Sequence, residues 1–208
     1  MNIAANLLQD ISITTEDGLH LEVDLYPAPQ PCCILAHGSA YNKDVWKMLA
    51  SSLQCWGWMA LALNFRGYGQ SGGIGPHYER DILACLDYAR SLTSGPIVLL
   101  GASMGGGAVL HALAQSTEAV DGVILLSPAG GVEHLPALKG KARLGLLLFS
   151  NEEAYVSIAQ GIAAHPPFPL WVQSWDGQRH AHKLLDDPLT GPELYSAIGT
   201  FLSKLRLR

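Results

Sequence analysis

Six short, continuous apolar runs separated by helix-like segments constrain the fold of this chain more than any other feature. Such runs are typical of strands buried on both faces of a parallel sheet, and alternation with helices predicts an α/β fold, a mostly parallel central sheet with helices on both faces. The runs are Cys32–Ala36, Met59–Asn64, Ile97–Gly101, Gly122–Leu126, Leu144–Phe149 and Leu170–Gln173. Helices are predicted at Asp44–Cys55, Tyr78–Leu92, Met104–Gln115, Tyr155–Ala164 and Pro192–Leu205.

Two further strands are predicted before the first run, at Ile11–Thr15 and Leu19–Tyr26, joined by the turn Glu16-Asp17-Gly18. In the second strand apolar residues alternate with His20, Glu22 and Asp24, which predicts one face in water. We therefore expect an antiparallel pair of N-terminal strands at one edge of the sheet.

Size and composition exclude several classes of protein. A chain of 208 residues suits one domain, residues 1–208. The net charge is −5 with no basic block, so nucleic acid is not an expected partner. No stretch approaches the roughly eighteen apolar residues that a membrane span needs, and the first thirty residues have no apolar segment typical of a secretory leader. The four cysteines include no Cys-x-x-Cys pair; we expect Cys32 and Cys33 to be buried thiols and the protein to be cytoplasmic.

The run that ends at Gly101 leads directly into Ala102-Ser103-Met104-Gly105-Gly106-Gly107 and then into a helix. Gly-x-Ser-x-Gly at the corner between a strand and a helix is the pattern of a nucleophile elbow, which projects the serine hydroxyl out of the sheet. The same residues also match the cofactor turn of short-chain dehydrogenases. That turn belongs near the start of a chain, and no tyrosine here has a lysine four residues later, so Ser103 is predicted to be a nucleophile.

Three segments in order resemble the α/β-hydrolase fold family, and the likeness runs from about residue 11 to the C-terminus. Leu35-Ala36-His37-Gly38-Ser39 resembles the family's oxyanion strand end, Arg66-Gly67-Tyr68-Gly69-Gln70-Ser71 its next loop, and Ser103 its elbow. The resemblance implies oxyanion donors at the backbone N–H groups of Ser39 and Met104. The segment Ser127–Arg143 is too short for an inserted cap domain, so we expect no substantial cap and an open site.

The family order of serine, acid and histidine implies the partners of Ser103. Glu153 stands at the family's acid position, two residues before Tyr155-Val156, with Glu152 as a close rival and Glu133 as a remoter one. His180 follows Gly177 in the spacing of the family's Gly-x-x-His-Gly, with Ala181 in place of the last glycine, and His182 could compete with it. His37 is expected to shape its loop.

These residues predict a carboxylesterase-like serine hydrolase that cleaves an ester, thioester or related acyl bond of a small molecule through an acyl-enzyme on Ser103. The alternatives are a non-catalytic binding protein on the same fold, and an acyltransferase or cofactor-free peroxidase with the same triad. No cofactor is expected, and no metal either, because His180 and His182 have no third ligand nearby. The acyl chain length and the oligomeric state remain open.

Overall fold

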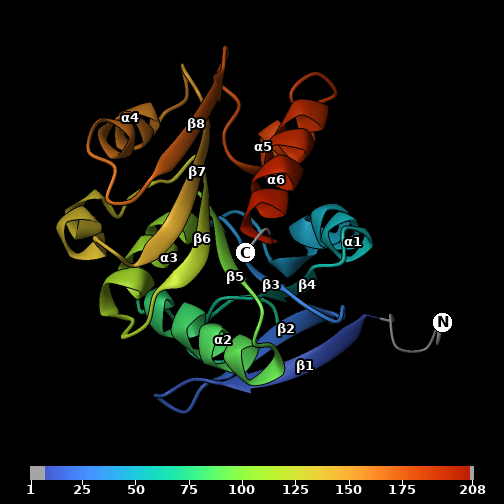
Figure 1. Ribbon diagram of the computed structural model, residues 1–208. Helices are drawn as coiled ribbons and strands as arrows, with labels where there is room; N and C mark the ends of the chain where they lie inside the picture. Colours follow the sequence, from blue (N-terminus) through green and yellow to red (C-terminus); the bar gives the residue numbers. More distant parts are fainter. Residues whose placement is uncertain (1–7, 207–208) are drawn as a thin grey trace.

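The computed structural model describes residues 8–206 (Figure 1). Residues 1–7, the first part of the segment in which the sequence predicts no secretory leader, lie outside this range. The strands are β1 (Gln9–Thr14), β2 (His20–Tyr26), β3 (Cys32–Ala36), β4 (Met59–Leu63), β5 (Ile97–Ala102), β6 (Val120–Leu126), β7 (Ala142–Ser150) and β8 (Leu170–Trp175). The α-helices are α1 (Lys47–Cys55), α2 (Tyr78–Leu92), α3 (Met104–Gln115), α4 (Val156–Ala164), α5 (His182–Leu185) and α6 (Gly191–Arg206), and the 3₁₀ helices are η2 (Lys43–Trp46) and η3 (Val132–Leu138).

All eight strands form one sheet in the order β1-β2-β4-β3-β5-β6-β7-β8. Strands β3 to β8 pair in parallel, whereas β2 is antiparallel to both β1 and β4. This topology confirms the predicted α/β class and the antiparallel N-terminal strands at one edge. The carboxyl ends of the parallel strands meet at one edge, where such sheets bind ligands.

Helices cover both faces of the sheet, as Figure 1 shows: α2, α3 and α4 lie on one side, and α1, α5 and α6 on the other. Each face has its own apolar core. Along β3, Ile34 packs into the core under α2 and α3, and the next residue, Leu35, packs into the core under α1 and α6. The continuous apolar runs of β3 to β7 exist because each of these strands contributes to both cores. Cys32 and Cys33 are buried as predicted.

The prediction that every apolar run is buried on both faces is wrong for the last one. β8 is an edge strand, and Trp171 and Val172 are 38% and 48% exposed. An apolar run records only hydrophobicity, so it does not distinguish an edge strand from a central one. The prediction that the polar face of β2 lies in water is also wrong for Asp24. Its side chain is buried beside the Lys43 ammonium group.

The helices confirm the predicted ones with small shifts at their ends. The segment predicted at Asp44–Cys55 is divided into η2 and α1, and Asn42 caps η2 by accepting a hydrogen bond from the Asp44 N–H. Between β6 and β7 the chain forms only a loop and η3. As expected, no large cap covers the carboxyl edge within the described residues.

Candidate active site

Ser103 lies at the corner between β5 and α3, with φ 53° and ψ −119°. Residues other than glycine rarely adopt a positive φ, so the surrounding structure must hold this conformation in place. The Ser103 N–H donates to the Leu126 carbonyl at 3.0 Å, and the Ser103 carbonyl accepts from the Gly106 and Ala129 N–H groups at 3.0 Å each. These bonds anchor the strained turn to the end of β6.

The glycines around Ser103 are required by close backbone contacts. A Cβ atom on Gly105 would lie 2.3 Å from the Ala36 carbonyl oxygen, and one on Gly101 would lie 2.3 Å from the Gly105 oxygen. Both distances are far inside van der Waals contact. The Gly-x-Ser-x-Gly pattern therefore lets α3 begin directly against the ends of β3 and β5.

The structure brings together the three side chains predicted to form the triad. His180 Nε2 lies 2.7 Å from the Ser103 hydroxyl oxygen. The other ring nitrogen, Nδ1, forms a hydrogen bond with Glu153 Oε2. A carboxylate at Nδ1 favours the tautomer with its proton there, which leaves Nε2 to accept the serine proton.

Burial distinguishes the three candidate acids. The Glu153 side chain is fully buried, and its Oε1 has no hydrogen-bond partner within residues 8–206. Glu152 is exposed, and its backbone N–H donates to the Gly177 carbonyl at 3.1 Å. Glu133 is two-thirds exposed, 66%, and lies 3.4 Å from His134. Of the three, only Glu153 is shown in contact with the imidazole.

His182 does not take the position of His180. It is fully buried at the start of α5, and its Nε2 accepts a hydrogen bond from the Gly38 N–H at 3.4 Å. Burial, with smaller contributions from His37 and His180, lowers the pKa of His182 to about 3. The neutral ring therefore remains a hydrogen-bond acceptor, and its bond to the Gly38 N–H restrains the segment after β3.

His37 holds the same segment from the other side, as predicted. Its Nδ1–H donates to the Gly38 carbonyl at 2.8 Å, and its Nε2 accepts from the Phe65 N–H at 3.2 Å. Burial lowers the pKa of His37 to about 4, which keeps the ring neutral. The Tyr68 hydroxyl donates to the next carbonyl, that of Ser39, at 3.1 Å.

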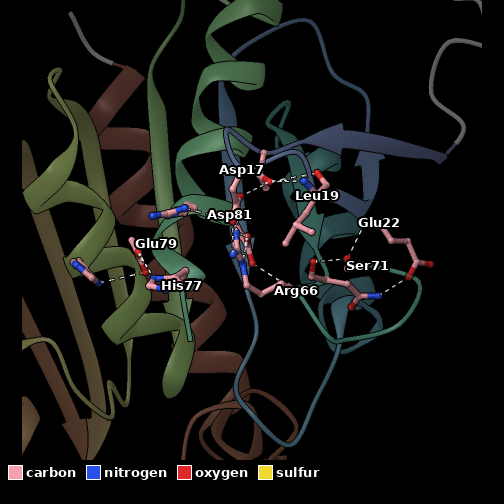
Figure 2. A network of polar contacts seen from close by, with 12 residues as sticks. Asp17, Leu19, Glu22, Arg66, Ser71, His77, Glu79 and Asp81 are labelled. Carbon is pink, nitrogen blue, oxygen red and sulfur yellow. Dashed lines mark hydrogen bonds and ion pairs between the residues drawn. The ribbon is translucent and has the colours of Figure 1, made fainter. Parts of the chain in front are cut away.

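The loop after β4 that carries Phe65 and Tyr68 is itself fixed by two ion pairs of Arg66, a buried one with Asp81 and a half-buried one with Asp17 (Figure 2). Arg66 is 2% exposed, and its guanidinium group donates to Asp17 at 2.8 Å and to Asp81 at 2.8 Å. The Arg66 hydrogen bond holds the pKa of Asp17 well below its usual range. The sequence identifies the Arg-Gly-x-Gly-x-Ser motif but does not indicate its partners, Asp17 on the β1–β2 turn and Asp81 on α2.

The predicted oxyanion donors flank Ser103. Ser39 follows Gly38, whose N–H and carbonyl groups are hydrogen-bonded to His182 and His37. Met104 is the first residue of α3, where backbone N–H groups have no intrahelical acceptor. Ser39, Ser103 and Met104 all line one cavity of about 420 Å³.

The same cavity contains residues that the sequence reasoning did not assign to the site, namely Glu79, His111 and His134. One signal was present in the sequence. Met104, Gly107, Ala108 and His111 have the spacing i, i+3, i+4, i+7, so they share one face of α3. His111 therefore lies two turns along the helix from the nucleophile.

Within residues 8–206, no group of three or more His, Cys, Asp or Glu side chains is arranged to hold a metal ion. The helices described there also include none that is long and apolar enough to cross a membrane.

Known proteins share this fold. An esterase from Pyrococcus furiosus superposes with a TM-score of 0.78 at 18% identity, covering 95% of this chain and 92% of the esterase. Est1E from Butyrivibrio proteoclasticus, solved with ferulic acid bound, superposes with a TM-score of 0.77 at 18% identity, covering 95% of this chain and all of the other, 100%. At this level of identity the likeness shows the fold alone.

Sequence comparison gives a narrower result. A monoacylglycerol lipase from Mycolicibacterium smegmatis is 31% identical over 109 residues, which are 49% of this chain and only 39% of the lipase. The model of the family described as serine aminopeptidase, S33, matches residues 27–165, more than half of the chain. That match includes Ser103 and Glu153 but ends before His180. The chain belongs to this family of α/β hydrolases.

Proposed function

We propose that this protein is a serine hydrolase that cleaves carboxylic ester bonds of small molecules through an acyl-enzyme on Ser103. The observation that carries the proposal is the continuous hydrogen-bonded series from Glu153 through His180 to the Ser103 hydroxyl. A serine hydroxyl is a weak nucleophile at neutral pH, and this arrangement is the one that activates it.

In the proposed mechanism, His180 Nε2 takes the hydroxyl proton as Ser103 Oγ attacks the ester carbonyl carbon. Glu153 orients the ring and stabilises its positive charge. The imidazolium then donates the proton to the alcohol oxygen, which leaves as the tetrahedral intermediate collapses to the acyl-enzyme. A water molecule, deprotonated by His180, attacks the acyl-enzyme in the same way and releases the acid.

The negative oxygen of each tetrahedral intermediate is proposed to accept hydrogen bonds from the N–H groups of Ser39 and Met104. Backbone donors of this kind typically lower the barrier by about 3 kcal/mol each when they are already in place. The contacts of His37, His182 and Tyr68 support such preorganisation, because they restrain the segment that carries Ser39.

Esters are favoured over other acyl bonds by the named relatives, an esterase and a monoacylglycerol lipase. The carboxylesterase activity and the roles of the individual residues are part of the proposal. An acyltransferase would use the same triad and differ in the acceptor of the acyl group, so product analysis with water and with added alcohols distinguishes the two. A non-catalytic binding protein would turn over no ester.

Hydrolysis of p-nitrophenyl acetate tests the proposal. We expect an initial burst of p-nitrophenol equal to the amount of enzyme if deacylation is the slow step, and steady turnover in either case. Ser103→Ala should lower kcat by at least about 10⁴-fold. Ser203→Ala, an exposed serine on α6, is the matched control and should leave kcat unchanged. Wild-type turnover in Ser103→Ala would overturn the mechanism.

A further inference from the structure

The cavity beside Ser103 ends in a cluster of ionisable side chains that the proposed mechanism does not use. Its lining runs from Ser103 and Met104 along α3 to His111, and it includes Glu79 from the first turn of α2. Met104 and His111 are seven residues apart, so they are separated by about 10 Å along the helix axis. The cluster therefore lies at the far end of this cavity from the nucleophile. The cavity is called the groove below.

Glu79 is the centre of this cluster. It is only 4% exposed, yet its carboxylate is held only loosely by its neighbours. Its Oε1 lies 3.3 Å from His77 Nδ1, a contact drawn in Figure 2. Its Oε2 lies 3.4 Å from His111 Nδ1. Both distances are longer than a good charge-assisted hydrogen bond. A buried carboxylate oxygen in this position can accept a stronger bond from a ligand.

The neighbouring imidazoles are oriented by their own contacts. The Gln115 amide lies 2.9 Å from His111 Nε2, so that nitrogen acts as the acceptor and Nδ1–H faces Glu79. The His134 ring stacks on His111 with a centroid distance of 4.3 Å and an interplanar angle of 6°. Both rings belong to the lining of the groove.

The charges of the groove restrict what can bind. Its described lining includes two carboxylates, Glu79 and Glu133, and neither lysine nor arginine. An anionic group would face these two carboxylates and meet neither lysine nor arginine in the described lining. An apolar chain end would leave only the two long imidazole contacts, at 3.3 Å and 3.4 Å, which is unfavourable for the desolvated Glu79 carboxylate. A hydrogen-bond donor, either a hydroxyl or an ammonium group, satisfies it.

The position of the base decides which part of an ester enters the groove. The leaving alcohol must lie within reach of His180 Nε2, which protonates it. The described lining of the groove includes Ser103 and Met104 but not His180. The acyl portion is thus the part that extends along α3.

We propose that this groove is an acyl subsite selective for acyl chains that end in a hydroxyl or ammonium group, with Glu79 as the specificity-determining residue. The inference rests on the proposed function and specifies its substrate class. The span along α3 corresponds to an extended chain of about eight atoms.

Four methyl esters of matched length test the proposal: methyl heptanoate, methyl ω-hydroxyhexanoate, methyl ω-aminohexanoate and monomethyl adipate, which end in methyl, hydroxyl, ammonium and carboxylate groups. One hydrogen bond to a carboxylate predicts that kcat/KM for the hydroxy or amino ester exceeds that for the heptanoate by about tenfold. The adipate should be the poorest substrate.

A higher kcat/KM for the amino ester than for the hydroxy ester identifies recognition by charge, and equal values for these two esters identify recognition by hydrogen bonding. Equal values for all four esters, or a preference for the heptanoate, would contradict the proposal.

Variants separate selectivity from stability. Glu79→Leu should bring the ratio of hydroxy ester to heptanoate to about one or below, whereas a purely structural role of Glu79 would lower both rates together and keep the ratio. His111→Asn gives a second measurement of the same ratio if the first variant folds poorly, and it should reduce the preference for the hydroxy ester. The control Glu118→Gln, an exposed glutamate at a distance from the groove, should keep the wild-type ratio.

The failure of this inference is distinguishable from failure of the proposed function. Turnover of p-nitrophenyl acetate that depends on Ser103, together with equal rates for the four esters, rejects the subsite and retains the hydrolase. Absence of turnover for every ester rejects both.

Discussion

The two sides of Ser103 are stabilised in different ways. On the N-terminal side, the segment after β3 is held by the loop after β4. That loop is fixed by the ion pairs of the buried Arg66 with Asp17 and Asp81. On the C-terminal side, Glu153 and His180 lie on the loops after β7 and β8. These loops are joined by backbone hydrogen bonds, from the Asn151 N–H to Trp175 at 2.8 Å and from the Glu152 N–H to Gly177 at 3.1 Å.

The difference corresponds to the two tasks proposed for these sides. The N-terminal side supplies backbone donors, whose value depends on fixed position, and buried charge networks provide a fixed frame. The C-terminal side supplies a carboxylate that must stabilise the positive charge formed on the imidazole during the reaction. A lysine or arginine beside Glu153 would compete with His180, and within residues 8–206 none forms an ion pair with it.

The largest effect is expected on the C-terminal side, from Glu153→Gln. The amide cannot stabilise the imidazolium and favours the wrong tautomer, so kcat should fall by about 10³- to 10⁴-fold with KM little changed. Steady-state kinetics measures this. Glu152→Gln is the matched control and should keep more than half of the wild-type kcat. The opposite result, with Glu152→Gln inactive, would assign the acid to the exposed neighbour.

The second effect concerns the N-terminal side and is one of stability. Arg66→Met leaves Asp81, which is fully buried, without its cationic partner. The free energy of unfolding should fall by about 3–5 kcal/mol in urea denaturation. Val172→Thr on the exposed edge strand β8 provides the comparison and should change it by less than about 0.5 kcal/mol. Equal effects of the two substitutions would show that the sides do not differ as described.

The third effect, confined to acid pH, is a dependence of stability on pH. The pKa values of His182 and His37 are lowered by burial to about 3 and about 4. Below about pH 6.5, the ordinary pKa of histidine, these two side chains bind protons in the unfolded chain but stay neutral in the folded protein. The folded protein therefore loses stability as the pH falls from about 6.5 toward 4. Each histidine contributes a slope of up to about 1.4 kcal/mol per pH unit.

His182→Gln, which keeps an acceptor and removes the titration, should reduce that slope by up to about 1.4 kcal/mol per pH unit in denaturation curves measured between pH 6 and 4. His165→Gln, at an exposed position, is the control. An unchanged slope in His182→Gln would show that this ring is not held neutral.

The sequence predicted most of the fold because strand burial and helix periodicity are local patterns. It did not show that β8 is an edge strand, because the order of strands in a sheet depends on tertiary packing. Ser103, Glu153 and His180 were predicted from chain order and motif spacing, and the structure places their side chains in contact. The contact of His182 with Gly38 joins residues 144 positions apart, which no local pattern reveals. Glu79 was missed because the start of α2 meets α3 only in the folded protein.

The most direct test of the account is covalent labelling by a fluorophosphonate, followed by intact mass measurement and peptide mapping. The account predicts one adduct per molecule, located on Ser103, and no adduct on Ser103→Ala. It also predicts that Glu153→Gln labels much more slowly than Glu152→Gln. Labelling of a residue other than Ser103, or full labelling of Ser103→Ala, would contradict it.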